Sequence, residues 1–298
     1  MPELPEVTTT VSGLNDVLPK LKITAVWSDY FLRTANKRTD NIKNKKFFEK
    51  FQKEIVGQTV KDSERRGKNI LIHLSGGHTI LIHMKMTGHL LYGKYHFDGK
   101  KWKSYDTDLS DPFNQFIHLV FSLSNGKHLA FSDVRKFAKV TFFPTKNREN
   151  ITDISLLGPE PLDISASDFQ KQLSKKPNGK IKTVLMDQSV LAGIGNIYSD
   201  EILWLSNIHP ERPVRKISTN EMAKILSSAK QVLKKSISLG GDSMSDYRNI
   251  FGKRGGFQKV HNVYRKTGDR CAKKNCGGII KRKVIGGRSA HFCPIHQK

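Results

Sequence analysis

Cysteine is scarce in this chain of 298 residues: there are three, Cys271, Cys276 and Cys293, all near the carboxyl-terminal end. Such clustering excludes a disulfide framework along the chain and favours a metal site in a reducing, intracellular compartment. Long apolar runs are absent too, since none approaches the ~20 residues that cross a bilayer. The first residues lack the charged and apolar regions of a secretory signal. We therefore expect a cytoplasmic protein with no role in a membrane.

Acidic residues are also scarce. The chain has 27 Asp and Glu residues against 51 Lys and Arg residues, which gives a formal net charge of +24. An excess of this size implies a polyanionic partner, and the candidates are nucleic acid, an anionic membrane surface and an acidic protein. We favour nucleic acid, since ribosomal and chromatin proteins are similarly basic.

The first half of the chain has the apolar alternation of antiparallel strands. A stretch with helical spacing at 6–18 comes first. Polar residues at 95–116 are expected to form a long loop. The pattern predicts an antiparallel β-sandwich with one leading helix, and the strands are expected at residues 22–27, 69–74, 79–84, 117–123, 128–131 and 139–143.

The carboxyl-terminal segment "CAKKNCGGIIKRKVIGGRSAHFCPIH" has the spacing C-x4-C-x16-C-x2-H. Two close ligand pairs separated by a hairpin-length spacer are typical of a structural zinc ribbon with one Zn²⁺. Three free thiols in a basic tail are the alternative. The short spacing from Cys293 favours His296 over His291 as the fourth ligand. The predicted metal ligands are therefore Cys271, Cys276, Cys293 and His296.

The residues between the sandwich and the zinc ribbon are predicted to form helices. Its longest helix is predicted to begin at the capping box "STNE" at 218–221 and to end at Gly240. The chain is thus expected to be an α+β protein of two domains, the second carrying the metal-bound β-hairpin. The predicted boundaries are 1–150 for the sandwich domain, 151–165 for a linker, 166–255 for the helical domain and 256–298 for the zinc finger.

Two further patterns indicate contacts with nucleic acid. In "LMDQSVLAGIGNIYSDEILW", the glycines permit a tight turn that places Asn196 at a helix N-terminus, where backbone amides attract phosphate. In "FSDVRKFAKV", Arg135 and Lys136 precede Phe137, and an aromatic ring beside cations suits insertion into a base stack. Plain helix packing and a core phenylalanine flanked by surface charges are the alternative interpretations.

Together these segments resemble the bacterial formamidopyrimidine-DNA glycosylase and endonuclease VIII superfamily. The first residues, "PELPEV", resemble the start of proteins of the formamidopyrimidine branch more than the start of endonuclease VIII. The similarity runs in order through "PELPEV" at 2–7, "RRGKNILIHL" at 65–74, "HMKMTGHL" at 83–90, "DVRKF" at 133–137, "LGPEPL" at 157–162, "AGIGNIYSDEILW" at 192–204, "GGDSMSDYRN" at 240–249, "VYRKTG" at 263–268 and "GGRSAHFC" at 286–293.

The resemblance implies a bifunctional DNA glycosylase and AP lyase of base excision repair. Its implied substrate is double-stranded DNA that contains oxidised purines (8-oxoguanine and formamidopyrimidines) or abasic sites. It also implies a helix-two-turn-helix in the helical domain and a place in the bacterial cytoplasm or nucleoid. Nothing in the sequence indicates an oligomer, and we expect a monomer.

The resemblance places the nucleophile at the start of the chain. Removal of Met1 would expose the secondary amine of Pro2, which attacks C1′ of the damaged nucleoside to form a Schiff base. An α-amino group has a pKa of about 8, so part of it is neutral at physiological pH. The iminium keeps its positive charge and acidifies the 2′ proton, and β- and δ-elimination then cut the strand. Glu3 matches the proton donor.

Other residues match the family's proton donors and DNA ligands. Lys68 matches the donor for β-elimination and Arg288 the donor for δ-elimination, and both match phosphate contacts. Asn196 and Lys180 match further DNA-binding residues. Met86, Arg135 and Phe137 match the trio that fills the void left by an extruded base, with Lys136 beside them as a phosphate ligand.

Three residues are implied to support the site. Glu6 matches a second carboxylate at the start of the leading helix, although stabilisation of a helix N-terminus is the alternative for Glu3 and Glu6. Glu201 is expected to order the glycine turn. Tyr247 lies in residues 242–262, which match the loop that covers an everted 8-oxoguanine.

The chain also departs from the family pattern. The first metal pair is C-x4-C instead of C-x2-C, and His296 stands where a fourth cysteine is usual. Val134, Lys136 and Ala138 stand where the family has proline, arginine and glycine. Residues 95–116 are longer than the usual loop. A preference for oxidised pyrimidines, and a zinc-dependent DNA-binding protein without catalysis, are the alternative functions; Pro2, Glu3 and Lys68 argue against the second.

Overall fold

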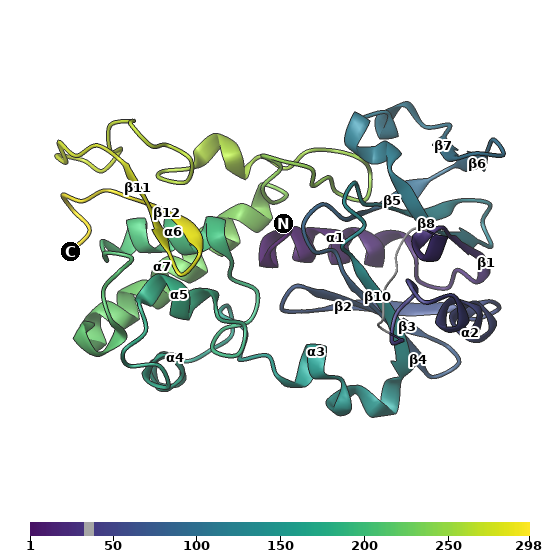
Figure 1. The fold of residues 1–298 in the computed structure, drawn as a ribbon, viewed down its shortest axis with the longest axis horizontal. Helices are drawn as coiled ribbons and strands as arrows, with labels where there is room; N and C mark the ends of the chain where they lie inside the picture. The colour runs from purple at the N-terminus through teal and green to yellow at the C-terminus, as the bar shows by residue number, and fades with distance from the viewer. Residues whose placement is uncertain (33–38) are drawn as a thin grey trace. The chain divides into compact units, whose positions relative to one another are not determined.

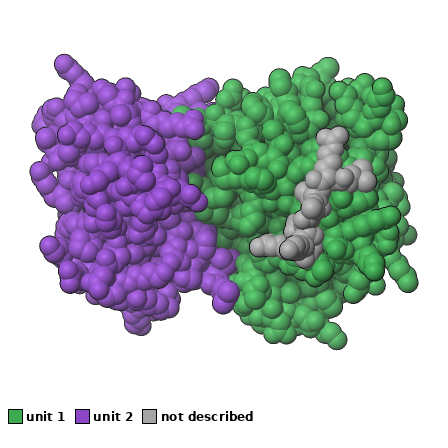
Figure 2. Space-filling model, in the orientation of Figure 1, with its two compact units in different colours: residues 1–155, 239–256 green, residues 156–238, 257–298 purple. Residues whose placement is uncertain are grey.

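The computed structural model describes residues 1–32 and 39–298 (Figure 1). The chain divides into two compact units, each of which has its own core (Figure 2). Unit 1 comprises residues 1–155 and 239–256, and unit 2 comprises residues 156–238 and 257–298. No helix in the described ranges has both the length and the apolar character needed to cross a membrane. The α+β fold class is confirmed.

Unit 1 is a sandwich of two antiparallel sheets, with strand orders β1-β8-β9-β5 and β10-β4-β3-β2. Neighbouring strands pair antiparallel, for example Ile70 with Ile82 and Ile72 with Ile80, and the register shifts by a bulge or irregularity near the ends of β1, β2 and β8. The strands are β1 (Ile23–Ser28), β2 (Val60–Arg66), β3 (Asn69–Leu74), β4 (His78–His83), β5 (His89–Gly93), β8 (Ile117–Leu123), β9 (His128–Ser132) and β10 (Lys139–Pro144).

The core of unit 1 follows from the period of two along its strands. In β3, Ile70 and Ile72 enter the core between the two sheets, whereas Leu71 packs on the outer side in a second, smaller cluster. The leading helix α1 (Leu4–Val17) buries Val7 and Leu14 in the main core. Complete burial of each such side chain contributes about 1.5–3 kcal/mol to stability.

Residues 95–116, hereafter the insert, do not form the expected loop, so that expectation is wrong. The strands β6 (Tyr95–Phe97) and β7 (Trp102–Ser104) pair as a hairpin, and two short 3₁₀ helices follow, η2 (Thr107–Leu109) and η3 (Pro112–Gln115). The hairpin forms because its aromatic rings have an apolar neighbour. The ring centroids of Phe97 and Trp102 lie 5.7 and 5.9 Å from that of Trp27 in β1.

The returning segment, residues 239–256, belongs to unit 1 although it follows the helices of unit 2. Its Ile250 is buried in the sandwich core, and the Asp242 amide donates to Glu6 of α1. The predicted boundaries (1–150, 151–165, 166–255 and 256–298) remain a prediction, and packing groups residues 239–256 with the first of these ranges rather than with the helices.

Unit 2 contains α4–α7 and the hairpin of β11 (Lys281–Ile285) and β12 (Arg288–Phe292). The prediction of the longest helix is confirmed, because the Ser218 amide donates to Glu221 Oε2 at 2.8 Å and the helix ends before Gly240. In the described ranges, the α-helices beyond α1 are α2 (Lys45–Ile55) and α3 (Thr152–Ser155) in unit 1 and α4 (Ala166–Ser174), α5 (Ile181–Met186), α6 (Asn196–Ser206) and α7 (Thr219–Ser238) in unit 2.

Acid is expected to destabilise unit 1 through His89, which is fully buried in β5. Burial lowers the pKa of His89 to about 4, below its usual 6.5. Between these two values the unfolded chain binds a proton that the folded chain excludes, so stability falls as the pH falls. The loss between pH 7 and pH 5 should be about 2 kcal/mol.

Urea unfolding of the wild type and of His89→Leu at both pH values measures this loss. The variant cannot titrate at this position, so its stability should fall less on acidification than that of the wild type. An equal pH dependence in the two proteins would contradict the assignment to His89.

Candidate active site and nucleic-acid interface

The first turn of α1 holds two buried carboxylates next to Pro2. Glu3 is the N-cap of the helix and forms a capping box with Glu6, whose Oε2 accepts from the Glu3 amide at 2.7 Å. Glu3 is 2% exposed and Glu6 is 1% exposed. The free amides and the dipole of a helix N-terminus stabilise negative charge at this position. Pro2 is buried, and the next residue, Glu3, is held through both its backbone amide and its side chain.

Glu6 also connects α1 to the returning segment. Its Oε1 accepts from the Asp242 amide at 2.7 Å, and its carbonyl oxygen accepts from the Tyr247 hydroxyl at 3.0 Å. Gly241 has φ +85°, and a Cβ there would lie 2.9 Å from Glu6 Oε1, so only glycine fits. Burial raises the pKa of Tyr247 well above 10, so its hydroxyl stays protonated. The structure thus brings together Glu6 and Tyr247, two of the predicted supporting residues.

Lys68 lies in the turn between β2 and β3, directly after Gly67, whose φ is +58°. Its side chain is largely buried, with 7% exposed. On the neighbouring strand, burial and the charges of Lys85 and Lys68 lower the pKa of His83 to about 3. His83 is therefore neutral at physiological pH and adds no positive charge to those of Lys68 and Lys85.

The predicted trio is exposed on two adjoining loops of unit 1. Met86 is 42% exposed and Phe137 is 49% exposed, so both apolar side chains are open to solvent. The guanidinium carbon of Arg135 lies 4.4 Å from the centre of the Phe137 ring, within the range of a cation–π contact. The pair thus presents an aromatic face and a cation together.

Asp133, which the sequence analysis did not single out, holds these two loops together. This fully buried carboxylate accepts from the hydroxyls of Thr87 and Tyr30 and from the Ala138 amide. Thr87 Oγ1 in turn accepts from the Arg135 amide at 3.1 Å. Because Thr87 follows Met86 directly, Asp133 fixes both loops that carry the trio. A single aspartate at a strand end has no sequence pattern that would reveal this role.

Lys136, the cation predicted beside the trio, forms an ion pair with Asp29. It has φ +53°, and its Nζ lies 3.1 Å from Asp29 Oδ2 in an ion pair that is largely shielded from solvent. Its predicted contact with phosphate remains a prediction, and a phosphate would compete with Asp29 for this ammonium group.

In unit 2, Asn196 is the first residue of α6, as predicted. The turn before it is held by Gln188, whose Oε1 accepts from the Gly193 amide and whose Nε2 donates to the Ile194 carbonyl, both at 2.9 Å. Among the described residues, nothing bonds to the buried Asn196 Oδ1. The backbone amides at this helix N-terminus are suited to bind an anion. Asn196 Oδ1 is an acceptor, so its partner in such a complex would be a donor group of the ligand or a bridging water.

Two exposed cations flank α5. Arg288 begins β12 after the turn of Gly286 and Gly287, and Lys180 is the N-cap of α5, with its Nζ 2.7 Å from Glu211 Oε1. A Cβ on Gly286 would lie 2.5 Å from the Thr183 side chain of α5, so the hairpin tip packs directly on that helix.

A buried ion pair, also absent from the sequence analysis, fixes the three elements that carry these residues. Lys182 of α5 and Asp200 of α6 are both fully buried and bonded to each other. Asp200 Oδ2 also accepts from the His291 amide of β12 at 2.9 Å and lies 3.0 Å from His291 Nδ1. His291 is thus engaged with Asp200, and His296 is the histidine of the metal cluster.

Glu201 does not order the glycine turn, so this expectation is wrong. Its fully buried carboxylate accepts from the backbone amides of Asn262, Val263 and Tyr264 at 2.9–3.0 Å. Hydrogen bonds from three consecutive backbone amides compensate the cost of burying this negative charge. Glu201 therefore orders the chain that leads to the metal cluster.

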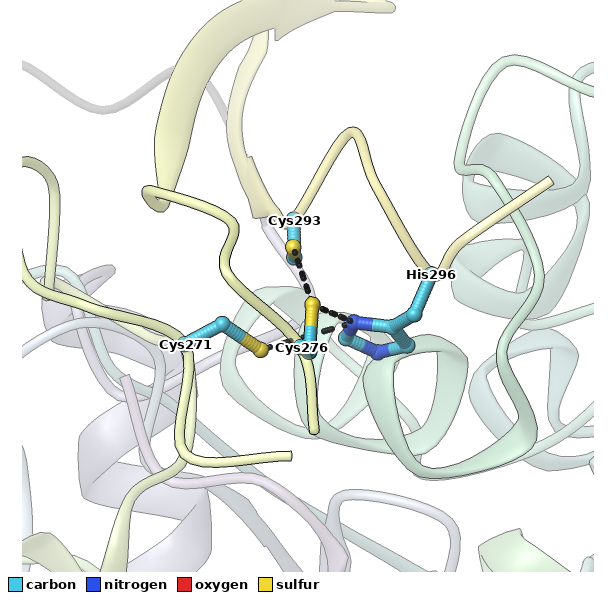
Figure 3. A group of neighbouring side chains, drawn as sticks. All are labelled: Cys271, Cys276, Cys293 and His296. Atoms are coloured by element: carbon cyan, nitrogen blue, oxygen red, sulfur yellow. Dashed lines mark hydrogen bonds between the residues drawn. The ribbon is translucent and has the colours of Figure 1, made fainter. Parts of the chain in front are cut away.

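The four predicted ligands converge in Figure 3, where their side chains point toward one another. Their ligand atoms all lie within 4.8 Å of one another. Cys276 Sγ lies 3.5 Å from Cys293 Sγ and 3.6 Å from His296 Nδ1. Such separations fit the edges of a metal tetrahedron with bonds of about 2.0–2.3 Å. The longer C-x4-C spacing therefore still yields a set of ligands that could bind a metal.

Trp204 of α6 contacts two of these ligands. Its indole Nε1 donates to Cys271 Sγ at 3.3 Å, and its carbonyl oxygen lies 3.2 Å from His296 Nε2. A proton on Nε2 leaves Nδ1 free to bind a metal, and an outer hydrogen bond of this kind orients a histidine ligand. Burial also lowers the pKa of His296, which keeps the imidazole neutral.

Comparison with known proteins identifies the family. The Formamidopyrimidine-DNA glycosylase N-terminal domain matches residues 1–140, and the Formamidopyrimidine-DNA glycosylase H2TH domain matches residues 157–248. These matches define a DNA repair glycosylase. The chain belongs to the formamidopyrimidine-DNA glycosylase family.

Relatives with this name match along the whole chain. The protein of Desulforamulus reducens is 37% identical, over 100% of this chain and 99% of its own length, and that of Bacillus cereus is 33% identical with the same coverage. Among solved structures, Lactococcus lactis Fpg with DNA containing an abasic site has a TM-score of 0.83 at 30% identity, covering 99% of both chains. MutM with DNA containing carbocyclic 8-oxo-G has a TM-score of 0.81 at 30% identity, covering 100% of both.

Replacing Asp200 with alanine should destabilise unit 2 strongly. Lys182 would be left buried without its counter-charge, which costs about 3–5 kcal/mol. Urea unfolding followed by helical circular dichroism measures the effect. Lys171→Met is the control, because it removes an exposed cation from an exposed ion pair and should change stability little. Similar stabilities of the two variants would contradict the role of the buried pair.

Proposed function

We propose that this protein is a bifunctional DNA glycosylase and AP lyase that removes oxidised purines from double-stranded DNA. The observation that carries the proposal is the arrangement at the start of α1, where Pro2 adjoins the buried carboxylate of Glu3. A buried carboxylate at this position is suited to proton transfer next to an amine nucleophile. The family membership supports the choice of substrate, as do the solved relatives, whose complexes hold DNA with an abasic site or with carbocyclic 8-oxo-G.

The proposed reaction begins when Met1 has been removed and the neutral Pro2 amine attacks C1′ of the damaged nucleotide. The bond from C1′ to the base breaks, and the base leaves with a proton. Glu3 protonates the ring oxygen of the sugar, so the sugar opens as an iminium on Pro2. The positive charge weakens the C2′–H bond. Loss of that proton expels the 3′ phosphate, and a second elimination expels the 5′ phosphate.

The remaining predicted residues have separate proposed roles. Lys68 supplies a proton in the first elimination and Arg288 in the second, and both contact phosphates. Asn196 binds phosphate with the amides at the start of α6. Lys180 contributes a further cation, although its Nζ is paired with Glu211 in the protein alone.

The exposed trio is proposed to enter the space that the everted nucleotide leaves. Phe137 wedges between bases, Met86 fills the void, and Arg135 donates to the orphaned base opposite. Apolar side chains exposed to solvent are explained if bases cover them in the complex. Asp133 would then act by holding the trio in place before DNA binds.

The metal is proposed to be one structural Zn²⁺, held by Cys271, Cys276, Cys293 and His296. Three sulfurs and one imidazole form a closed ligand set of the kind that zinc prefers in structural sites, and no ligand position is left for a substrate. The ion would stabilise the segment that presents Arg288. Zinc cysteines need a reducing compartment, and we propose that the protein works as a monomer in the bacterial cytoplasm.

Borohydride trapping tests the proposed nucleophile. Protein with a free Pro2 should form a covalent complex with a duplex that pairs 8-oxoguanine with cytosine. One extra residue before Pro2 converts the amine to an amide, so the complex should be lost. A duplex with thymine glycol tests the alternative preference for oxidised pyrimidines. A complex that survives the extension would refute the mechanism, and DNA binding without any complex would indicate a non-catalytic binder.

Elemental analysis tests the metal. We expect one zinc per chain in freshly purified protein, and Cys293→Ser should lose zinc and bind DNA more weakly. The sheets of unit 1 should keep their thermal transition, because the cluster lies wholly in unit 2. Ser289→Ala changes a nearby residue outside the cluster and serves as the control. Protein without metal, or Cys293→Ser with full zinc content, would contradict the assignment.

A further inference from the structure

The second part of the insert packs on the returning segment, and both belong to unit 1. The contact centres on Arg248, which is only 2% exposed. Its Nε and Nη2 each lie 2.8 Å from Asp111 Oδ2, and its guanidinium lies 5.3 Å from the centre of the Phe113 ring. Its Nη1 donates to the carbonyl oxygens of Ser245 and Tyr247 at 3.0 and 2.8 Å. The guanidinium is therefore held by acceptors from both segments.

Asp111 is held in place by the insert itself. It is the N-cap of η3, and its Oδ1 accepts from the Phe113 amide at 3.0 Å. Burial acts to raise the pKa of Asp111, but the Phe113 amide and the Arg248 guanidinium outweigh burial, and the pKa is lowered. Asp111 is therefore an ionised and fixed partner for Arg248 at neutral pH.

Besides the ion pair, the chain just after Arg248 packs closely against neighbouring segments. Gly252 has φ +78°, and a Cβ there would lie 2.6 Å from the Asp108 carbonyl oxygen of the insert. The Ile250 carbonyl accepts from the Tyr92 amide at 2.7 Å, and the Ile250 side chain packs against Gly13 of α1. Residues 248–252 thus lie between α1 and the insert, where side chains on either glycine would clash.

We propose that Arg248 is a positioning residue, and that its pair with Asp111 clamps the returning segment in the conformation that covers an everted base. This inference rests on the proposed function, since the resemblance assigns that covering role to residues 242–262. A segment that is ordered before DNA binds loses less conformational entropy when it closes over a base. The clamp therefore assists release of a damaged base, and cleavage at an abasic site, which has no base to cover, does not need it.

Two variants break the clamp from opposite sides, Arg248→Met and Asp111→Asn. Single-turnover rates are measured at saturating enzyme on a duplex with 8-oxoguanine and on a duplex with an abasic site. Base release should slow by about tenfold or more in each variant, whereas abasic cleavage should stay within about twofold. The double variant should be little slower than either single variant, because both remove the same pair. Arg248→Lys should restore only part of the rate, since lysine lacks the two-pronged geometry.

Hydrogen exchange of the free protein tests the clamp without any activity. Amides of residues 243–254 should exchange about tenfold faster in both variants, and those of β3 should be unchanged. Lys103→Met is the matched control in the insert. Its Nζ lies 2.6 Å from Asp98 Oδ2 in an ion pair at the surface, so neither the exchange of residues 243–254 nor base release should change.

The outcomes separate this inference from the proposed function. If the wild type releases no 8-oxoguanine, the proposed function fails, and the exchange measurement still shows whether the clamp exists. Equal slowing of base release and abasic cleavage would overturn the proposal, because it would indicate a general structural role. Unchanged exchange in Arg248→Met and Asp111→Asn would overturn it as well. Selective slowing together with faster exchange supports it.

Discussion

The carboxylate of Glu6 is the constraint on which the amino-terminal site depends. One oxygen accepts from the Glu3 amide and the other from the Asp242 amide, so a single side chain joins the start of α1 to a segment more than two hundred residues later. Both of its oxygens therefore hold backbone amides in place, which is a structural task. The proposed function gives proton transfer to the other carboxylate of this helix turn, Glu3.

Buried charge organises unit 2 in a comparable way. Lys182, Asp200 and His291 come from α5, α6 and β12, and these elements also carry or adjoin Lys180, Asn196 and Arg288. Buried ion pairs are weak evidence for stability, because desolvation offsets much of their attraction. The role of this buried charge is to fix positions, because each of the three proposed DNA-contacting residues lies on or next to an element that the buried group holds in place. The predictions made for stability and for DNA contacts therefore concern the same three elements.

The sequence predicted what depends on short spacing, and it failed where the contact is distant. The leading helix, the helix after the "STNE" capping box and the metal ligands follow from residues a few positions apart, and all are seen in the structure. The apolar spacing of Phe48, Phe51 and Ile55 would have indicated α2. No local pattern could have revealed Asp133 or the pairing of Arg248 with Asp111, because their partners lie far along the chain. The polar composition of the insert predicts a loop, because the sequence does not show the aromatic contacts that Phe97 and Trp102 make with Trp27.

The return of residues 239–256 to the first unit has a consequence for synthesis. When the ribosome has released residues 1–155, the sandwich still lacks Ile250, and α1 still lacks the Asp242 amide that binds Glu6. Chains generally fold domain by domain from the amino terminus as they emerge. This one cannot finish its first unit in that order: the helices of the second unit must be translated before the last piece of the first core arrives. A chain truncated between residues 156 and 238 would therefore expose an unfinished sandwich rather than yield an independent amino-terminal domain.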